Sequence, residues 1–352
     1  MNFSYDPLPA RVLFGVGKRG EVSAEVHRLN RRRALIITTP SQEKLAHEIR
    51  AALGERCVGI HDGAVQHVPY HSIATTLEIV SDKAADLLIA LGGGSTIGLA
   101  KGVALETGLP ILAIPTTYAG SEMTHIWGIS REGNKRTGRD PIVKPKTVIY
   151  DPELVVSLPP ALSLVSGVNA MAHAVEALYA ENANPIASLM AEESIRALGV
   201  GLPKVVAQPD DIDARTQTLY GAWLAATVLD QVGMALHHKL CHTLGGSFNM
   251  PHAQTHTVIL PYATAYNASH APDAMAAIGR ALDCDPADAP KAIQDISRNG
   301  GGPVSLKELG FDAANLDRAA EIAVQNPYYN PRPVTCDGVR ALLDAAFHGE
   351  HP

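Results

Sequence analysis

Short apolar runs alternate with helical patterns through the first 150 residues. Stretches after Pro40 to about Leu53, over 71–84 and from about Ser95 to Thr107 have the character of helices. Strands that alternate with helices predict a parallel sheet covered on both faces, and nearly all-apolar strands fit burial on both sides. The runs that we expect to form strands are 34–39, 57–63, 86–93, 110–117 and 147–152.

The pattern changes after Asp151-Pro152. Before this point, the charged, glycine-rich segment 128–146 predicts a hairpin or loop over the sheet. From the LPPAL segment at 158–162 onward, alanine-rich helical periodicity dominates, interrupted by GGSFNMPH (245–252) and NPYYNPRP (326–333). We therefore expect an α/β domain at 1–157 and an all-helical domain at 158–352.

Composition narrows the class of protein. A chain of 352 residues with 46% hydrophobic and 18% charged residues is long enough for two folded domains, and it is not dominated by disorder. A net charge of −7 and 5% aromatic residues argue against nucleic acid or an anionic membrane as the main partner. The balance is typical of a soluble enzyme.

The cysteines and the N-terminus indicate a location in the cell. Four cysteines without CxxC spacing fit reduced thiols and suggest neither a disulfide framework nor a cysteine metal site. The first residues do not resemble a signal peptide, and no run approaches the ~18 apolar residues of a membrane span. We expect a cytoplasmic protein.

Two small-residue loops follow neighbouring strands and suggest a phosphate site. Gly92-Gly93-Gly94-Ser95 ends one strand and opens a helix, where bare backbone and free N–H groups can approach a pyrophosphate. The spacing to Gly98 is one residue longer than in the usual dinucleotide fingerprint, so a plain tight turn is the alternative. The second loop is residues 115–122, and both loops should lie at the carboxyl edge of the sheet.

Histidines at helical spacing form the second candidate site. His238 and His242 share one helix face, and His252 follows after a glycine-rich turn. His173 lies on another helix, with Asn169 one turn earlier on the same face. We interpret these residues as functional, with structural core histidines as the alternative; His237 points off this face and is expected to be a neighbour.

The segment NPYYNPRP has two readings. Tyr328 and Arg332 lie between helix-breaking prolines, so a rigid loop could present hydrogen-bond donors to a ligand. A simple connection between helices is equally compatible with the sequence.

Taken in order, GGGSTIGLAK, PTTYAGSE, the Asn169/His173 helix, His238-x3-His242-x9-His252 and NPRP resemble the iron-containing alcohol dehydrogenases over essentially the whole chain. The family fold resembles that of dehydroquinate synthase. Within the family, GGGSTIGLAK, His237-His238-Lys239 and NPYYNPRP are most similar to the maleylacetate reductase branch.

Two residues depart from the alcohol dehydrogenase pattern. Metal-binding members carry an aspartate where this chain has Asn169, beside histidines that match His173, His238 and His252. A neutral amide is a weaker ligand than a carboxylate, so we expect no obligatory metal, although the three histidines could hold a weak divalent ion. Gly98 likewise takes the place of a family aspartate.

The resemblance implies reduction of the carbon–carbon double bond of 2-maleylacetate to 3-oxoadipate by NADH or NADPH. It implies that His242 donates a proton or stabilises an enolate, that His173, His238 and His252 line a pocket in the cleft between domains, and that a homodimer forms. Partners for the substrate carboxylates would be Lys239, His242, Tyr328 and Arg332. Cofactor contacts would come from Gly93, Gly94, Ser95, Thr116, Thr117, Tyr118 and the neutral Thr39, which would admit either cofactor.

Three other functions stay open on the sequence. A metal-dependent alcohol or glycerol dehydrogenase would need a bound metal, against which Asn169 argues. A dehydroquinate-synthase-like lyase would need a metal and a basic phosphate site, and we find no such basic set in the sequence. An NAD-binding sensor without catalytic activity would leave the histidine pattern unexplained.

Overall fold

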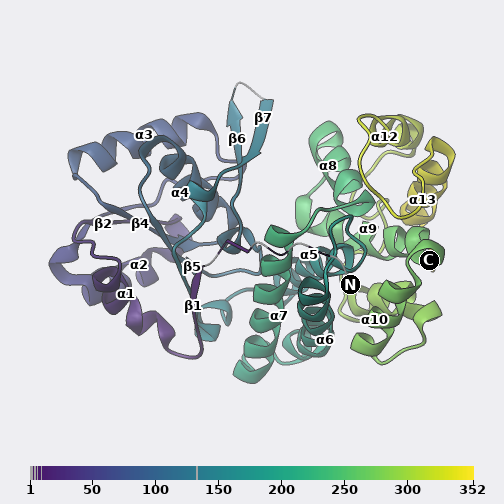
Figure 1. The fold of residues 1–352 in the computed structure, drawn as a ribbon, viewed down its shortest axis with the longest axis horizontal. Coiled ribbons are helices and arrows are strands. Elements are labelled where there is room, and N and C mark those ends of the chain that lie inside the picture. Colours follow the sequence, from purple (N-terminus) through teal and green to yellow (C-terminus); the bar gives the residue numbers. More distant parts are fainter. Residues whose placement is uncertain (1–2, 4, 6, 9, 132–133) are drawn as a thin grey trace. The chain divides into compact units, whose positions relative to one another are not determined.

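The computed structural model describes residues 3, 5, 7–8, 10–131 and 134–352. Its chain forms two compact units, Pro7–Leu158 and Pro159–Pro352, and Phe3 and Tyr5 group with the second (Figure 1). The first is an α/β unit and the second is helical, which confirms the expected fold class.

A six-stranded sheet organises the first unit. All its strand pairs are parallel, and the order across the sheet is β1-β8-β5-β4-β2-β3. Strands β2, β4, β5 and β8 are buried along their whole length, as their apolar sequences predict. The strands are β1 (Arg11–Phe14), β2 (Ala34–Ile37), β3 (Cys57–His61), β4 (Leu87–Gly92), β5 (Ile111–Pro115) and β8 (Thr147–Tyr150).

Helices cover both faces of this sheet (Figure 1). Alternate residues of each strand point to opposite faces, so Ile36 and Ile89 pack in one core with α1 (Val22–Arg28) and α2 (Glu43–Leu53). Leu35 and Leu88 pack in the other core with α3 (Tyr70–Asp82) and α4 (Gly94–Thr107). The expected parallel sheet with two helical layers is therefore confirmed.

The charged segment before β8 forms a separate hairpin. β6 (Ile126–Arg131) and β7 (Asn134–Arg139) pair antiparallel, from Ile126 opposite Arg139 to Arg131 opposite Asn134. This outcome agrees with the hairpin predicted for 128–146; residues 132–133 lie outside the described part of the chain.

The second unit consists of helices. Most contain the alanine-rich periodicity seen in the sequence, and α5 packs against α6, α7 and α9. Their bounds are α5 (Pro160–Leu178), α6 (Pro185–Ala207), α7 (Ile212–Gln231), α8 (Leu236–Phe248), α9 (His252–Asn267), α10 (Pro272–Leu282), α11 (Ala289–Asn299), α12 (Leu316–Ala323) and α13 (Cys336–His348).

Helix α5 is long and apolar. By length and composition alone it could cross a membrane. However, 78% of the apolar window is buried inside the structure, and α5 carries the polar residues Asn169, His173 and Glu176. These are the properties of a core helix.

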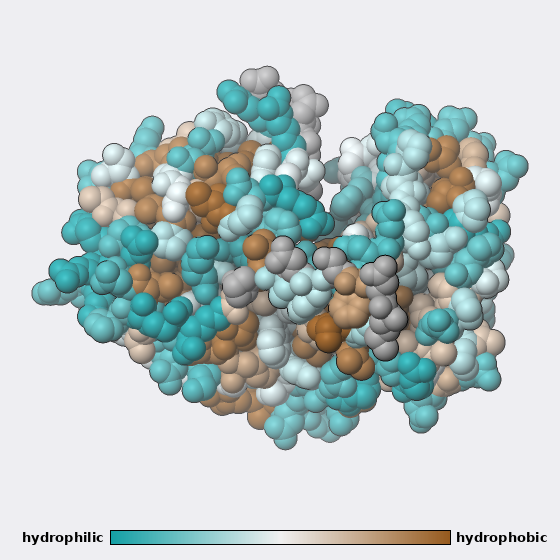
Figure 2. Space-filling model, viewed as in Figure 1, coloured by the Kyte–Doolittle hydropathy of each residue, from teal (hydrophilic) through white to brown (hydrophobic). Residues whose placement is uncertain are grey.

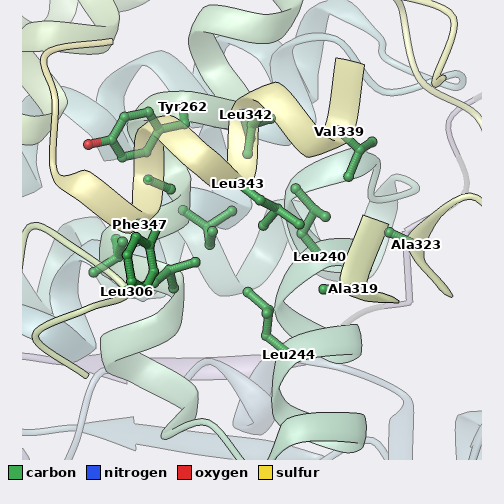
Figure 3. Close-up of a cluster of buried hydrophobic side chains, with 14 of the residues drawn as sticks. Leu240, Leu244, Tyr262, Leu306, Ala319, Ala323, Val339, Leu342, Leu343 and Phe347 are labelled. Atoms are coloured by element: carbon green, nitrogen blue, oxygen red, sulfur yellow. The ribbon is translucent and has the colours of Figure 1, made fainter. Parts of the chain in front are cut away.

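A hydrophobic core holds α8 in place. Leu240 and Leu244 pack with Val339 and Leu343 of α13 and with Ala319 of α12 (Figure 3). Since Leu240 and Leu244 are one turn apart, this contact fixes one face of α8 and leaves His238 and His242 on another face. Packing on one side of the helix therefore positions the histidines on the other.

One local expectation is wrong. Gly245 and Gly246 belong to α8, which continues to Phe248, so only residues 249–251 form the turn before His252. Hydrophobic side chains are also exposed in places: Figure 2 shows a largely hydrophilic face with several separate hydrophobic areas, and Leu189 is 68% exposed. Singly exposed apolar residues of this kind are normal on protein surfaces.

Candidate active site

The glycine-rich loop connects β4 to α4. Gly92 has a φ of 148°, which residues with a Cβ rarely adopt. A Cβ on Gly93 would lie 2.9 Å from Cγ2 of Thr117 in the following loop, so glycine is what allows the two loops to approach. Gly93 is the N-cap of α4, and no described side chain caps this helix. The first N–H groups of α4 are thus suited to bind a phosphate.

The order of the strands brings the predicted cofactor residues to one edge of the sheet. β4 lies between β5 and β2, so the loops after these three strands are neighbours. Thr39 follows β2, is partly exposed, and pairs with Ser41 at 3.0 Å between hydroxyl oxygens. The connections run in opposite directions from β2 and β4, which is the point where open α/β sheets bind ligands.

Burial separates the residues of the loop after β5. Thr117 is partly exposed, as is Ser95 in the adjacent loop. Thr116 is buried and donates its N–H to the carbonyl oxygen of Gly92 at 3.2 Å, while Tyr118 is fully buried. A contact between the Tyr118 side chain and a cofactor would therefore require the loop to move.

Two buried charged side chains make hydrogen bonds that stabilise these loops. Lys101 of α4 donates hydrogen bonds to Thr124 and to the carbonyl oxygen of Ile126, at 2.8–2.9 Å. Glu122 accepts a hydrogen bond from the hydroxyl of Tyr150 at 2.8 Å, and burial raises the pKa of the Glu122 carboxyl. Lys101 is the last residue of GGGSTIGLAK and Glu122 is the last residue of PTTYAGSE. In this chain, both side chains therefore stabilise the loops through contacts within the protein.

Gly98 has a packing role. A Cβ at this position would lie 2.6 Å from Cγ2 of Val68, so the aspartate of other family members would not fit here without a shift of Val68.

Histidine rings from three helices of the second unit form one cluster. His173 of α5 stacks on His238 of α8, with ring centroids 5.1 Å apart. His238 also lies 6.1 Å from His242 and 5.1 Å from His256 of α9, which in turn lies 4.4 Å from His252. The histidines singled out in the sequence are therefore close together.

A carboxylate that the sequence analysis overlooked lies beside the cluster. Glu176 of α5 is fully buried, and its Oε2 lies 2.6 Å from Nδ1 of His238. Oε2 also accepts a hydrogen bond from the N–H of Ala235 at 3.0 Å, and Oε1 accepts one from the N–H of His237 at 2.7 Å. One side chain thus links α5 to the start of α8.

Burial keeps most of the inner histidines neutral. The pKa values of His173, His237 and His256 are lowered well below 6.5, first by desolvation and then by neighbouring histidines. His242 and His252 are exposed at the outside of the cluster. The cluster therefore has three buried histidines whose neutral form is favoured and accessible imidazoles at its edge.

Several polar atoms of the cluster lack a partner among the described residues. They include Oδ1 of Asn169, Nδ1 of His173 and Nε2 of His238, all from residues at most 7% exposed. Buried polar atoms normally make hydrogen bonds, so unpaired atoms in adjacent residues indicate a place for a polar ligand.

One donor departs from the metal site of the alcohol dehydrogenases. Asn169 supplies a neutral oxygen where a carboxylate would be needed, whereas Glu176 contacts only Nδ1 of His238 and leaves Nε2 available to a ligand. Among the described residues, the group of three His, Cys or acidic side chains with ligand atoms within 4.8 Å of one another is His237, Cys241 and His256, a different set.

This second set is better explained as a hydrogen-bonded part of the core. Nε2 of His237 lies 2.9 Å from Nδ1 of His256, whereas two nitrogen ligands of a tetrahedral zinc ion lie about 3.3 Å apart. Burial also raises the pKa of the Cys241 thiol well above its usual value, which disfavours the thiolate that a metal requires.

The segment at 326–333 connects α12 to α13 and also contacts the site helices. Lys239 of α8 donates to the carbonyl oxygen of Gln325 at 3.0 Å and lies 5.5 Å from the ring centre of Tyr328. Burial raises the pKa of Tyr328, whose buried hydroxyl has no partner in the described chain. Arg332 instead stacks on Tyr266 and donates to its carbonyl oxygen at 3.1 Å. Of the predicted carboxylate partners, Arg332 is thus engaged in holding the loop.

Glu176 and His256 could have been found in the sequence. Glu176 follows His173 by three residues and Asn169 by seven, which places all three on one face of an otherwise apolar helix. His256 follows His252 by one turn. A lone carboxylate on the histidine face was the available signal.

Comparison with known families gives matches to both units. Residues 9–152 match the family described as "Iron-containing alcohol dehydrogenase". Residues 163–347 match the family described as "Fe-containing alcohol dehydrogenase family, C-terminal".

Individual relatives match over the whole chain. The maleylacetate reductase of Sphingobium indicum is 50% identical, over 100% of this chain and 99% of the relative. Maleylacetate reductase 2 of Cupriavidus pinatubonensis is 51% identical, over 98% and 96%. The crystal structure of maleylacetate reductase from Agrobacterium tumefaciens is similar with a TM-score of 0.97 and 46% identity, over 100% of both chains.

Proposed function

The chain belongs to the iron-containing alcohol dehydrogenase family, and we propose that within it this oxidoreductase reduces 2-maleylacetate to 3-oxoadipate with NADH or NADPH. The observation that carries the proposal is the set of unpaired polar atoms on Asn169, His173 and His238, in which Asn169 is an uncharged amide. Relatives about half identical over their full length are maleylacetate reductases, which supports the same substrate here.

A site with an uncharged Asn169 suits this reaction better than it suits reduction of an aldehyde. Reduction of a double bond conjugated to a ketone places negative charge on an enolate oxygen, which hydrogen-bond donors can stabilise. Reduction of an isolated carbonyl in this family relies on a metal as Lewis acid, and Asn169 lacks the charge to hold one strongly. The metal-dependent alcohol dehydrogenase alternative is accordingly weaker.

We assign cofactor binding to residues 1–157. Gly93, Gly94 and the N–H groups that open α4 would hold the pyrophosphate, because a Cβ on Gly93 would fill the space between the loops. Thr117 and Ser95 are exposed enough to add hydrogen bonds, and Thr39 would lie by the ribose. The nicotinamide cofactor bound there supplies the hydride.

We assign substrate chemistry to residues 158–352. The hydride goes to the double-bond carbon that bears a carboxylate, and the ketone oxygen becomes the enolate oxygen. A proton then adds to the double-bond carbon next to the ketone, which gives 3-oxoadipate. His242 is exposed at the edge of the cluster and is our candidate for the proton donor. Lys239 and Tyr328 are our candidates for holding the substrate carboxylates, with His173, His238 and His252 lining the same site. Arg332 would take part only by releasing its contacts with Tyr266.

We further propose that the protein is a homodimer and that it is located in the cytoplasm. The cytoplasmic location is in keeping with the scattered, unpaired cysteines Cys57, Cys241, Cys284 and Cys336. Gel filtration with light scattering measures the oligomeric state directly.

Deuterium transfer tests the proposed reaction. With maleylacetate and nicotinamide cofactor deuterated at C4, we expect deuterium in 3-oxoadipate on the CH2 carbon that is bonded to a carboxylate but not to the ketone. NMR detects this position. Deuterium on a carbinol carbon would instead identify a carbonyl reductase and contradict the proposal.

A further inference from the structure

Glu176 makes contacts that the reaction scheme does not yet use. Its carboxylate is fully buried and accepts three hydrogen bonds, from Nδ1 of His238 and from the backbone N–H groups of Ala235 and His237. A buried carboxylate is costly unless it is paired in this way. Its position beside a histidine cluster points to a role in that cluster.

The backbone contacts make Glu176 the cap of α8. The N-cap residue of this helix is Ala235, whose methyl group cannot accept a hydrogen bond, and no described side chain of its own segment caps the helix. Glu176 supplies the missing acceptor from α5, and its negative charge also favours a helix N-terminus. The start of α8 is thus fixed to α5.

The third contact sets the state of the His238 ring. Because both oxygens of Glu176 also accept from backbone N–H groups, we assign the proton of this contact to Nδ1 of His238. The ring then has one atom left for another partner, Nε2, and this atom is buried and unpaired in the described chain. His173 stacks on the same ring, and its Nδ1 is also unpaired.

We propose that Glu176 is a positioning residue of the reductase site. By holding Nδ1 of His238 and the first turn of α8 with one carboxylate, it fixes the ring so that Nε2 is the atom presented to the substrate. The proposal depends on the assigned reaction only for the identity of the substrate, because the orientation of His238 can be measured without turnover.

Replacing the carboxylate by an amide is the direct test. Glu176→Gln keeps the size of the side chain, but its NH2 group must face at least one of the three N–H donors. The start of α8 or the His238 ring then shifts, and we expect kcat/KM for maleylacetate to fall roughly 10²-fold. NADH affinity should stay unchanged, since the glycine-rich loop is in the other unit.

A matched variant controls for loss of a helix cap. Asp211 caps α7 in the same unit by accepting from the N–H groups of Asp213 and Ala214, at 2.9 and 3.1 Å. Asp211→Asn makes the same carboxylate-to-amide change away from the histidines. We expect kcat/KM per folded molecule to stay within twofold of wild type for this variant.

Two readouts show whether Glu176 acts through His238. Glu176→Gln should cause little further loss of kcat/KM in a His238→Ala background, and in 15N-histidine spectra the low-field Nδ1 proton of His238 should move upfield or vanish. An unchanged His238 signal, or near-normal turnover by Glu176→Gln, would overturn the proposal. A wild-type protein that does not reduce maleylacetate would refute the proposed function instead, and the spectra would still decide the role of Glu176.

Discussion

At the scale of single residues, neutral side chains occupy two positions where a charge would change the chemistry. Thr39 follows β2 at the edge of the sheet where the glycine-rich loop lies, and Asn169 lies one turn before His173 in the histidine cluster. We propose that the first affects the choice of cofactor and the second affects metal binding. Both consequences can be tested by adding a carboxylate.

Thr39→Asp should damage the use of NADPH selectively. The wild-type protein, with no carboxylate there, is expected to use both cofactors, whereas an aspartate would repel the 2′-phosphate of NADPH. The ratio of kcat/KM values for the two cofactors measures this effect. Ser81→Asp, near the amino end of β4, is a control that should leave the ratio unchanged; equal losses with both cofactors in Thr39→Asp would show that Thr39 is not near the ribose.

Asn169→Asp should raise the affinity for a divalent metal, because it restores a charged ligand beside His173 and His238. The wild-type protein should retain full activity after exhaustive chelation. Elemental analysis of both proteins measures the bound metal. One tightly held iron or zinc ion per wild-type chain, with activity lost on its removal, would contradict this expectation.

His242→Ala should lower turnover on the order of 10²–10⁴-fold if this imidazole donates the proton. NADH affinity should change little, because the proposed cofactor residues lie in the other unit. Turnover, NADH binding and melting temperature must be measured on the same variant. Near-normal turnover per folded molecule with a lower melting temperature would assign His242 a structural role and move the proton donor to His238.

At the scale of elements, the loops after β4 and β5 work as a pair. Gly93 and Thr117 approach so closely that a single methyl group would separate them. Lys101 then ties α4 to the chain after the second loop. The geometry of the proposed phosphate site therefore depends on how two neighbouring strands end, and it can be disturbed without changing a charged residue.

Gly93→Ala should raise the KM for NADH roughly 10-fold, because the added Cβ meets Cγ2 of Thr117 at 2.9 Å and must displace the loop. Gly20→Ala is the control, since a Cβ there has no neighbour within 4 Å. Steady-state kinetics with NADH varied provide the measurement. Equal KM values for the two variants would show that the loop contact does not shape the cofactor site.

The elements that the sequence predicted correctly are those with a strong pattern. Apolar runs such as 86–93 became buried strands because both faces of a parallel sheet must be covered. β1 went unpredicted: it has four residues and is partly exposed at the edge of the sheet, so it lacks such a run. Gly245 and Gly246 suggested a break, but packing of Leu240 and Leu244 keeps α8 intact through them.

At the scale of the whole molecule, the sequence located the histidines but not what orients them. Helical spacing was enough to place His238 beside His242 and Asn169 beside His173. The link between the two helices is Glu176, which contacts residues 59–62 positions away in the sequence. Contacts of this range depend on how helices pack, which a periodic pattern does not specify.

The central claim is that a site with an uncharged amide at Asn169 reduces a conjugated double bond without a metal. The most direct measurement is NADH oxidation by the chelator-treated protein with maleylacetate and, separately, with a panel of simple aldehydes. We predict rapid oxidation with maleylacetate, unchanged by chelation, and a kcat/KM at least about 10³-fold lower with every aldehyde, a difference of about 4 kcal/mol in transition-state stabilisation. Comparable rates with an aldehyde, abolished by chelation and restored by iron or zinc, would contradict the account.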